Sequence, residues 1–388
     1  MARTCALGAQ GRQFKSARSD IMKFFKPAAF LTFVVVWLVR VMKILSSIKT
    51  GVLPDFYLFY RAVSNLFLPK PNFDLIVKSS YGPPFIYVPF LIFVHWPFWL
   101  AEVTITLLSL FGYLASFYLL WKMNHKKTTS LFWLLMAMMA YSFPIVYSLG
   151  MGNPLGVVTL GIYGFFVFKN KFLKGFLLAV SSLLKIFPLS ILAGFRQKEI
   201  TIGFASFFIG LLLSTIILPV RIWPHYLDWL IRIDPLSKRI INPSIYNQSF
   251  SSTLARFSGL TEFSPNYYYV FIFFILLIFT WVVLIVGKKI RIDSLDLSML
   301  ALSAMLLIHP YPWQYYFATL LPYLVIKTAS GNYYFLLPLC LMSVDGNRIV
   351  SSGFVKAAAD SSQFFAALIL FFMIMFIYLN ELKLKNNQ

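Results

Sequence analysis

Residues 100 to 121 read LAEVTITLLSLFGYLASFYLLW, an apolar stretch whose only charged residue is Glu102. A helix that crosses a bilayer needs about 20 mainly apolar residues, so this stretch is long enough to span one. Similar runs follow one another along the chain, at 28–47, 83–98, 131–149, 153–168, 172–195, 200–219, 267–287, 296–309, 313–327, 331–344 and 363–380. We therefore expect an all-α fold, a polytopic transmembrane helical bundle of about ten to twelve spans.

The composition excludes a water-soluble globular protein. Hydrophobic residues occupy 59% of the 388 positions and charged residues only 12%, which leaves too little polar surface to cover the apolar residues. A transmembrane β-barrel is excluded as well, because the runs are apolar on every face and do not alternate in polarity. The first run is too long for a signal peptide and lacks a small-residue cleavage pattern, so we expect it to stay as an anchor.

The chain carries 34 Lys and Arg against 13 Asp and Glu, a formal net charge of +21. In a soluble protein this excess would suggest a nucleic-acid partner. Here the basic residues flank apolar runs, which is typical of cytoplasmic segments and of contact with membrane lipids, and we expect no nucleic-acid partner. We predict a basic cytoplasmic segment at 1–27, one membrane domain at 28–380 and a cytoplasmic tail at 381–388.

Two long polar segments, 48–82 and 220–266, interrupt the apolar runs. With a cytoplasmic N-terminus, counting spans predicts that both are extracytoplasmic loops. A strict twelve-span arrangement, however, leaves the basic turns Lys122–Lys127 and Lys169–Lys174 on the outer side. If the proline-rich run 83–98 and the run 172–195 are broken or re-entrant, both turns return to the cytoplasmic side, and the sequence leaves the two arrangements open.

Asp55 is a candidate catalytic carboxylate. It lies just beyond the first span in LPDFYLFYRA, residues 53–62, where aromatic residues surround a single acid. An apolar environment raises the pKa of a carboxylate, and the nearby Arg61 opposes that effect. Asp after Pro also commonly opens a helix, so a capping role is the alternative, and the two roles are compatible.

Lys185 lies inside an apolar run, in LLKIFP at 183–188, where an ammonium is costly without a partner or a hydrated cavity. The alternative is a lysine that reaches the interface beside a helix break. Asn247-Gln248-Ser249 is either a glycosylation acceptor or polar lining, and His309 to Tyr315 is either part of a site or an interfacial aromatic belt. The two cysteines, Cys5 and Cys340, form no metal or redox motif, and we expect no metal or other cofactor.

The order of the polar islands resembles glycosyltransferase family 87, a member of the GT-C superfamily, between about residues 28 and 330. The islands are Asp55-Phe56 with Tyr60 and Ala62, Tyr81-Gly82-Pro83-Pro84, Gly152-Asn153, Leu184-Lys185-Ile186-Phe187-Pro188, Asn247-Gln248-Ser249 and His309-Pro310-Tyr311-Pro312-Trp313. Two departures exist. Gly150-Met151-Gly152-Asn153 stands where family members often show Gly-Gln-x-Asn, and Gln314-Tyr315-Tyr316 stands where they show one or two histidines.

The resemblance implies a cell-membrane enzyme that moves a hexose, typically mannose, from a polyprenyl-phosphate sugar to a glycolipid or glycan on the outer face. Asp55 occupies the place of the catalytic base. A phosphate leaving group needs no general acid, so one carboxylate suffices, and a single displacement would invert the anomeric carbon. Candidates for holding the donor phosphate are Lys185, Arg61, Arg221 and Arg256, and further candidates for substrate binding are Tyr81, Asn153, Asn247, Gln248, His309 and Trp313.

A transporter or lipid flippase is the chief alternative, since it would share the spans, the broken helices and the buried lysine. Against it, the two halves of the sequence show no internal repeat, and the polar residues concentrate in two loops instead of at the bilayer midplane. A purely structural membrane scaffold is a further alternative, but it leaves Lys185 unexplained.

Overall fold

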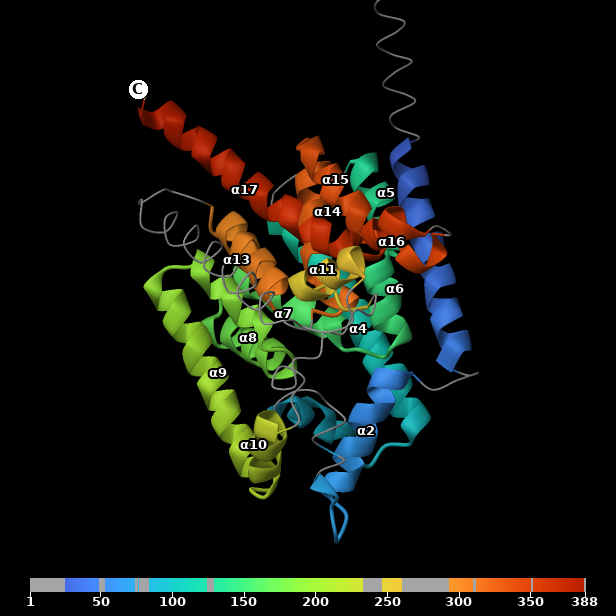
Figure 1. Cartoon of the computed structure of the whole chain (residues 1–388), viewed down its shortest axis with the longest axis vertical. Coiled ribbons are helices and arrows are strands. Elements are labelled where there is room, and N and C mark those ends of the chain that lie inside the picture. Colours follow the sequence, from blue (N-terminus) through green and yellow to red (C-terminus); the bar gives the residue numbers. More distant parts are fainter. Residues whose placement is uncertain are drawn as a thin grey trace, which may run out of the picture.

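The computed structural model describes residues 25–48, 53–73, 76, 84–123, 129–232, 246–259, 293–309, 312–349 and 352–386. Over these ranges every regular secondary-structure element is a helix, and the β-pairing is one isolated antiparallel bridge between Asn247 and Trp313. The prediction of an all-α fold is confirmed (Figure 1).

Up to residue 232, the described residues form a helix at Phe25–Ile48 and ten further elements. These are α2 (Pro54–Leu66), the 3-10 helix η1 (Pro84–Phe93), α4 (Phe98–Met123), α5 (Ser130–Met139), α6 (Phe143–Gly150), α7 (Leu155–Val167), α8 (Lys171–Leu184), the 3-10 helix η2 (Phe187–Gly194), α9 (Gln197–Ile217) and α10 (Ile222–Arg232).

Beyond residue 246, the described residues form mostly short helices and 3-10 turns, followed by the long α17. They are α11 (Phe250–Ser258), α13 (Ser294–Ile308), η3 (Gln314–Leu320), α14 (Leu321–Ala329), η4 (Tyr333–Phe335), α15 (Leu336–Ser343), η5 (Gly346–Arg348), α16 (Gly353–Asp360) and α17 (Ser362–Asn386).

Within the described ranges, three helices are long and apolar enough to cross a membrane: Phe25–Ile48, α4 and α9. The number rises to five if the bent pairs α5 with α6 (44°) and α16 with α17 (65°) each form one span. The chain is therefore an embedded membrane protein, while the count of ten to twelve spans stays a prediction. The expected run 267–287 lies outside the described residues.

The apolar run 172–195 is broken where the sequence suggested. Helix α8 ends at Leu184, Lys185 is extended, and η2 follows from Phe187. The Lys174 ammonium lies 4.5 Å from the centre of the Phe165 ring and 5.5 Å from that of Phe195. Since Lys174 and Phe195 stand near opposite ends of the run and yet lie together, the run enters and returns at one end of the bundle.

The run 84–98 also folds back, against α2. The Phe56 ring lies within 6.3 Å of the rings of Phe90, Phe93 and Phe98, and the Tyr60 hydroxyl donates to the Trp96 carbonyl at 2.7 Å. One helical turn of α2 therefore contacts the second part of the run, between Phe90 and Phe98. A return of both runs to the side from which they start is the arrangement expected for re-entrant segments, which stays a prediction.

One helix from each of the two long polar segments lies at the same end of the bundle. The Phe73 ring stacks on the His225 ring at 5.3 Å, and Figure 1 shows α2 and α10 at the same end of the bundle. Helix α5 begins at the other end, beside the start of the helix Phe25–Ile48, because Phe30 and Trp133 are in edge contact at 4.8 Å.

Candidate functional site

The first turn of α2 is held by groups distant in sequence. The Leu53 N–H donates to Oε1 of Glu102 at 2.6 Å, and the N–H groups of Asp55 and Phe56 donate to the Met151 carbonyl at 3.0 and 3.2 Å. Leu53 is the N-cap residue and makes no side-chain capping bond. The capping interpretation of Asp55 is therefore wrong, because its carboxylate lies in the first turn and points elsewhere.

The Asp55 carboxylate faces the loop between α6 and α7. Its Oδ2 accepts a hydrogen bond from Nδ2 of the buried Asn153 at 2.9 Å. The Asn153 carbonyl in turn accepts from the Ser109 hydroxyl at 3.0 Å, which fixes this loop to α4. Gly152 makes the approach possible: it has a φ of +68°, and an added Cβ would lie 2.7 Å from the Cβ of Phe56.

Electrostatics around Asp55 act in opposite directions. Burial raises the pKa of its carboxyl above the ordinary value, while hydrogen bonds from Asn153 and Tyr315 and the positive charge of Lys185 lower it. The net effect is a raised pKa, which increases the basicity of the ionised carboxylate. A base of this kind can accept a proton from a hydroxyl group.

Lys185 caps the end of α8 and is half-buried. Its ammonium lies 5.0 Å from the centre of the Tyr316 ring and 6.0 Å from those of Tyr315 and Phe59. Over the part of the chain that the structure describes, it makes no ion pair within 4 Å. The ring contacts compensate only part of the desolvation of an ammonium, so Lys185 is suited to bind an anion.

The segment 309–316 closes this cluster. The rings of His309 and Tyr316 are in edge contact at 5.9 Å, and Tyr315 lies 5.6 Å from Tyr147 of α6. Tyr147 also stacks on Tyr246 at 4.9 Å. Side chains from α2, the α6–α7 loop, the α8–η2 break and the α13–η3 connection therefore converge on one site.

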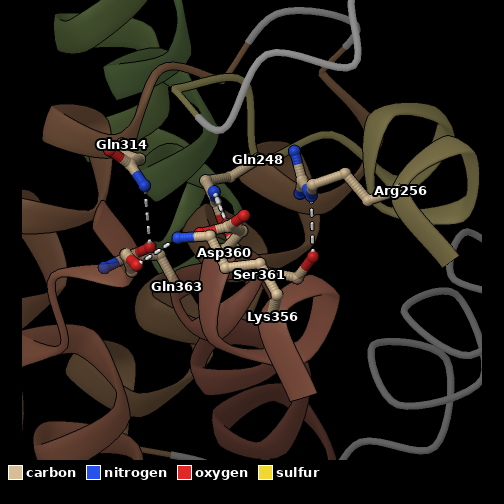
Figure 2. A network of polar contacts seen from close by, with 8 residues as sticks. Gln248, Arg256, Gln314, Lys356, Asp360, Ser361 and Gln363 are labelled. Carbon is tan, nitrogen blue, oxygen red and sulfur yellow. Dashed lines mark hydrogen bonds and ion pairs between the residues drawn. The ribbon is translucent and has the colours of Figure 1, made fainter. Parts of the chain in front are cut away.

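Gln248 belongs to a buried network beside the site (Figure 2). The buried Asn247 precedes it and pairs with the partly buried Trp313 through the antiparallel bridge. The Gln248 side chain donates to the Asp360 carbonyl at 2.6 Å and accepts from the Phe364 N–H at 3.2 Å. The Oδ1 of Asn247 accepts from the Ser249 N–H at 3.0 Å. Asn247 is 2% exposed, so the folded chain does not present it as a glycosylation acceptor.

Arg256 lies in the same network, away from Asp55. Its guanidinium donates to the Ser361 hydroxyl, the Asn247 carbonyl, the Ser252 hydroxyl and the Thr253 hydroxyl at 2.8 to 3.2 Å. Burial lowers the pKa of Arg256 to about 10, and the negative charge of Asp360 opposes this. Figure 2 shows the guanidinium turned toward Ser361, which favours a structural role over phosphate binding.

The remaining predicted residues are dispersed. Arg61 and Arg221 are exposed, and no contact in the described residues joins them to the cluster. Tyr81 lies outside the described residues. The structure thus brings together Asp55, Asn153, Lys185 and His309. It adds Tyr147 and Tyr315 to this cluster. Glu102 lies outside the cluster, bonded to the Leu53 N–H, and it had a detectable signal, since an acid inside an apolar run is as costly as Lys185.

The model of glycosyltransferase family 87 matches residues 81–310. The chain belongs to this family. The match includes three members of the cluster, Asn153, Lys185 and His309, whereas Asp55 precedes it and is joined to the site by its bond to Asn153. No curated protein and no solved structure matches the chain. Membership of glycosyltransferase family 87 makes the protein a glycosyltransferase and disfavours the transporter and scaffold alternatives.

Proposed function

We propose that this glycosyltransferase transfers a hexose, typically mannose, from a polyprenyl-phosphate sugar to a hydroxyl group of a glycolipid or glycan. The observation that carries the proposal is the presence in one cluster of a basic carboxylate, Asp55, and of the Lys185 ammonium, which makes no ion pair with any described residue. The first suits deprotonation of a hydroxyl and the second suits an anionic phosphate.

The reaction is a single displacement. The acceptor oxygen bonds to the anomeric carbon as the carbon–oxygen bond to the lipid phosphate breaks, and the acceptor proton passes to Asp55. The bonding electrons leave with the phosphate, which is a weak base and needs no proton from the enzyme. Lys185 balances its charge, and the anomeric configuration inverts. A lipid-linked donor also fits a site reached from within a membrane.

We infer that the site faces the extracytoplasmic side. Helix α2 of the segment 48–82 and helix α10 of the segment 220–266 lie at the end opposite to the start of the helix Phe25–Ile48, and Phe73 and His225 join the two segments there. Positive charge favours the cytoplasmic side, which leaves the other end outside. A cysteine at the half-buried Ser64 should then react with an impermeant maleimide in intact cells, while one at Ser130, beside the opposite end, should not.

Membranes supplied with radiolabelled polyprenyl-phosphate mannose test the activity. Wild-type membranes should label a lipid or glycan product, and Asp55→Asn should reduce the rate by about 100-fold or more while donor binding persists. Asp345→Asn is the matched control, because Asp345 pairs with Arg348 at a different part of the chain. If the product is labelled only when polyprenyl-phosphate glucose replaces the mannose donor, the mannose assignment is overturned. Wild-type turnover by Asp55→Asn would remove Asp55 as the base.

A further inference from the structure

Glu102 is a buried acid that the proposed reaction does not use. It stands in the first two turns of the span α4 and is 2% exposed. A carboxyl group in such a position is costly and persists where it makes a specific interaction. Its Oε1 accepts a hydrogen bond from the Leu53 N–H at 2.6 Å, so the interaction joins α4 to the start of α2.

The residues at the start of α2 do not supply the side-chain acceptors that usually cap a helix. The first N–H groups of a helix have no partner within it. A capping box satisfies the N-cap N–H with a Glu or Gln at the third helical position, which here is the apolar Phe56. Phe56 is fully buried against aromatic residues of the 84–98 run, and a polar residue there would break that packing.

Groups from elsewhere in the chain take over the capping. Glu102 accepts from the Leu53 N–H, Pro54 has no N–H, and the Met151 carbonyl accepts from Asp55 and Phe56. Every donor at the start of α2 is therefore satisfied without the Asp55 carboxylate. That carboxylate remains available to Asn153 and to a substrate hydroxyl.

We propose that Glu102 is a positioning residue for the catalytic carboxylate: its bond to the Leu53 N–H fixes the first turn of α2 so that Asp55 faces Asn153 and Lys185. The inference rests on the proposed role of Asp55. The positioning requires an acceptor atom at the distance that the Glu102 side chain reaches, and it does not require the negative charge of the carboxylate. Length and charge can be separated by two conservative variants.

Glu102→Gln keeps the length and an acceptor oxygen but loses the charge, so it should retain most of the wild-type kcat. Glu102→Asp keeps the charge but is one methylene shorter and cannot maintain the 2.6 Å bond. It should lower kcat by about 10- to 100-fold with little change in donor KM, because the catalytic group is displaced while donor binding is not. Thr106→Val is the control, since it removes a buried hydroxyl one turn further along α4 that bonds only the Glu102 carbonyl.

Hydrogen exchange of the purified protein gives a readout that does not depend on activity. Peptides covering residues 53–60 should exchange faster in Glu102→Asp than in wild type, and at wild-type rates in Glu102→Gln and Thr106→Val. Wild-type exchange in Glu102→Asp, or equal loss of kcat in both Glu102 variants, would overturn the inference. If Asp55→Asn turns over normally while Glu102→Asp still exchanges faster, the base assignment fails and the anchoring of α2 stands.

Discussion

Gly152 should be the most sensitive glycine near the site, because two independent constraints meet there. Its φ of +68° lies in the left-handed region, and an added Cβ would lie 2.7 Å from the Cβ of Phe56 and 2.9 Å from that of Leu53. Both neighbours belong to the first turn of α2 or its cap. An alanine at 152 would therefore strain its own backbone and also push α2 away from the α6–α7 loop.

The two costs can be estimated separately. A non-glycine residue in the left-handed conformation costs about 1–2 kcal/mol. A contact below 3.0 Å between a Cβ and atoms close to the backbone adds overpacking of about 1–3 kcal/mol. Gly152→Ala should therefore destabilise the protein by about 2–5 kcal/mol in total. If α2 moves by about 1 Å, the rate should also fall by up to about 100-fold.

Two other glycines serve as controls. Gly259 has a φ of +67° but nothing within 4 Å of an added Cβ, so Gly259→Ala carries the backbone cost alone. Gly150 ends α6 with open space around it, and Gly150→Ala should be neutral or stabilising by about 0.5–1 kcal/mol. In detergent, the melting temperature should be highest for Gly150→Ala, lower for Gly259→Ala and lowest for Gly152→Ala. Transfer assays should show a loss of activity only for Gly152→Ala. Equal melting and turnover of Gly152→Ala and Gly259→Ala would refute the role of the contact with α2.

Three further outcomes follow from the site. Asn153→Ala removes a donor that lowers the pKa of Asp55, so the acidic limb of the kcat/KM profile, where activity is lost as Asp55 is protonated, should move to higher pH; an unmoved limb would contradict the assignment. Lys185→Met should weaken binding of a fluorescent donor analogue by about 1.5–3 kcal/mol without lowering the melting temperature, whereas early melting with normal binding would make Lys185 structural. Arg256→Met leaves buried acceptors unpaired and should lower stability by about 2–4 kcal/mol while the folded variant binds donor normally; a loss of donor affinity alone would restore Arg256 as a phosphate ligand.

Local sequence rules identified the apolar helices and most members of the cluster, because both depend on residue type and order, but they did not identify α2, α10 and α11 in the segments expected to be loops. They failed where the deciding partner is distant. Pro54-Asp55 is a sound capping signal, but the acceptors at the start of α2 come from Glu102 and Met151, 49 residues and more away. Arg256 and Lys185 were equal candidates for the phosphate, and only the fold shows that the Arg256 guanidinium is already bonded to Asn247 and Ser361.

The four clustered residues share a feature that explains their position. Each stands at a helix end next to or near a proline: Pro54 precedes Asp55, Pro154 follows Asn153, Pro188 stands three residues after Lys185, and Pro310 follows His309. Proline is best tolerated at the start of a helix, where Pro54 and Pro154 stand, and the residue before a proline is driven to an extended backbone, as His309 shows with ψ of 133°.

Within a bilayer, a helix end leaves backbone groups that lipid cannot satisfy, so such breaks persist only where protein or water covers them. A carboxylate and an ammonium need the same surroundings, since each is costly in contact with lipid. The prolines and the charged side chains therefore depend on one polar region: the breaks supply backbone dipoles, and these lower the cost of the charges that the proposed reaction needs. A proline that breaks an apolar run beside a polar residue is, in a chain of this class, a physical indicator of a candidate site.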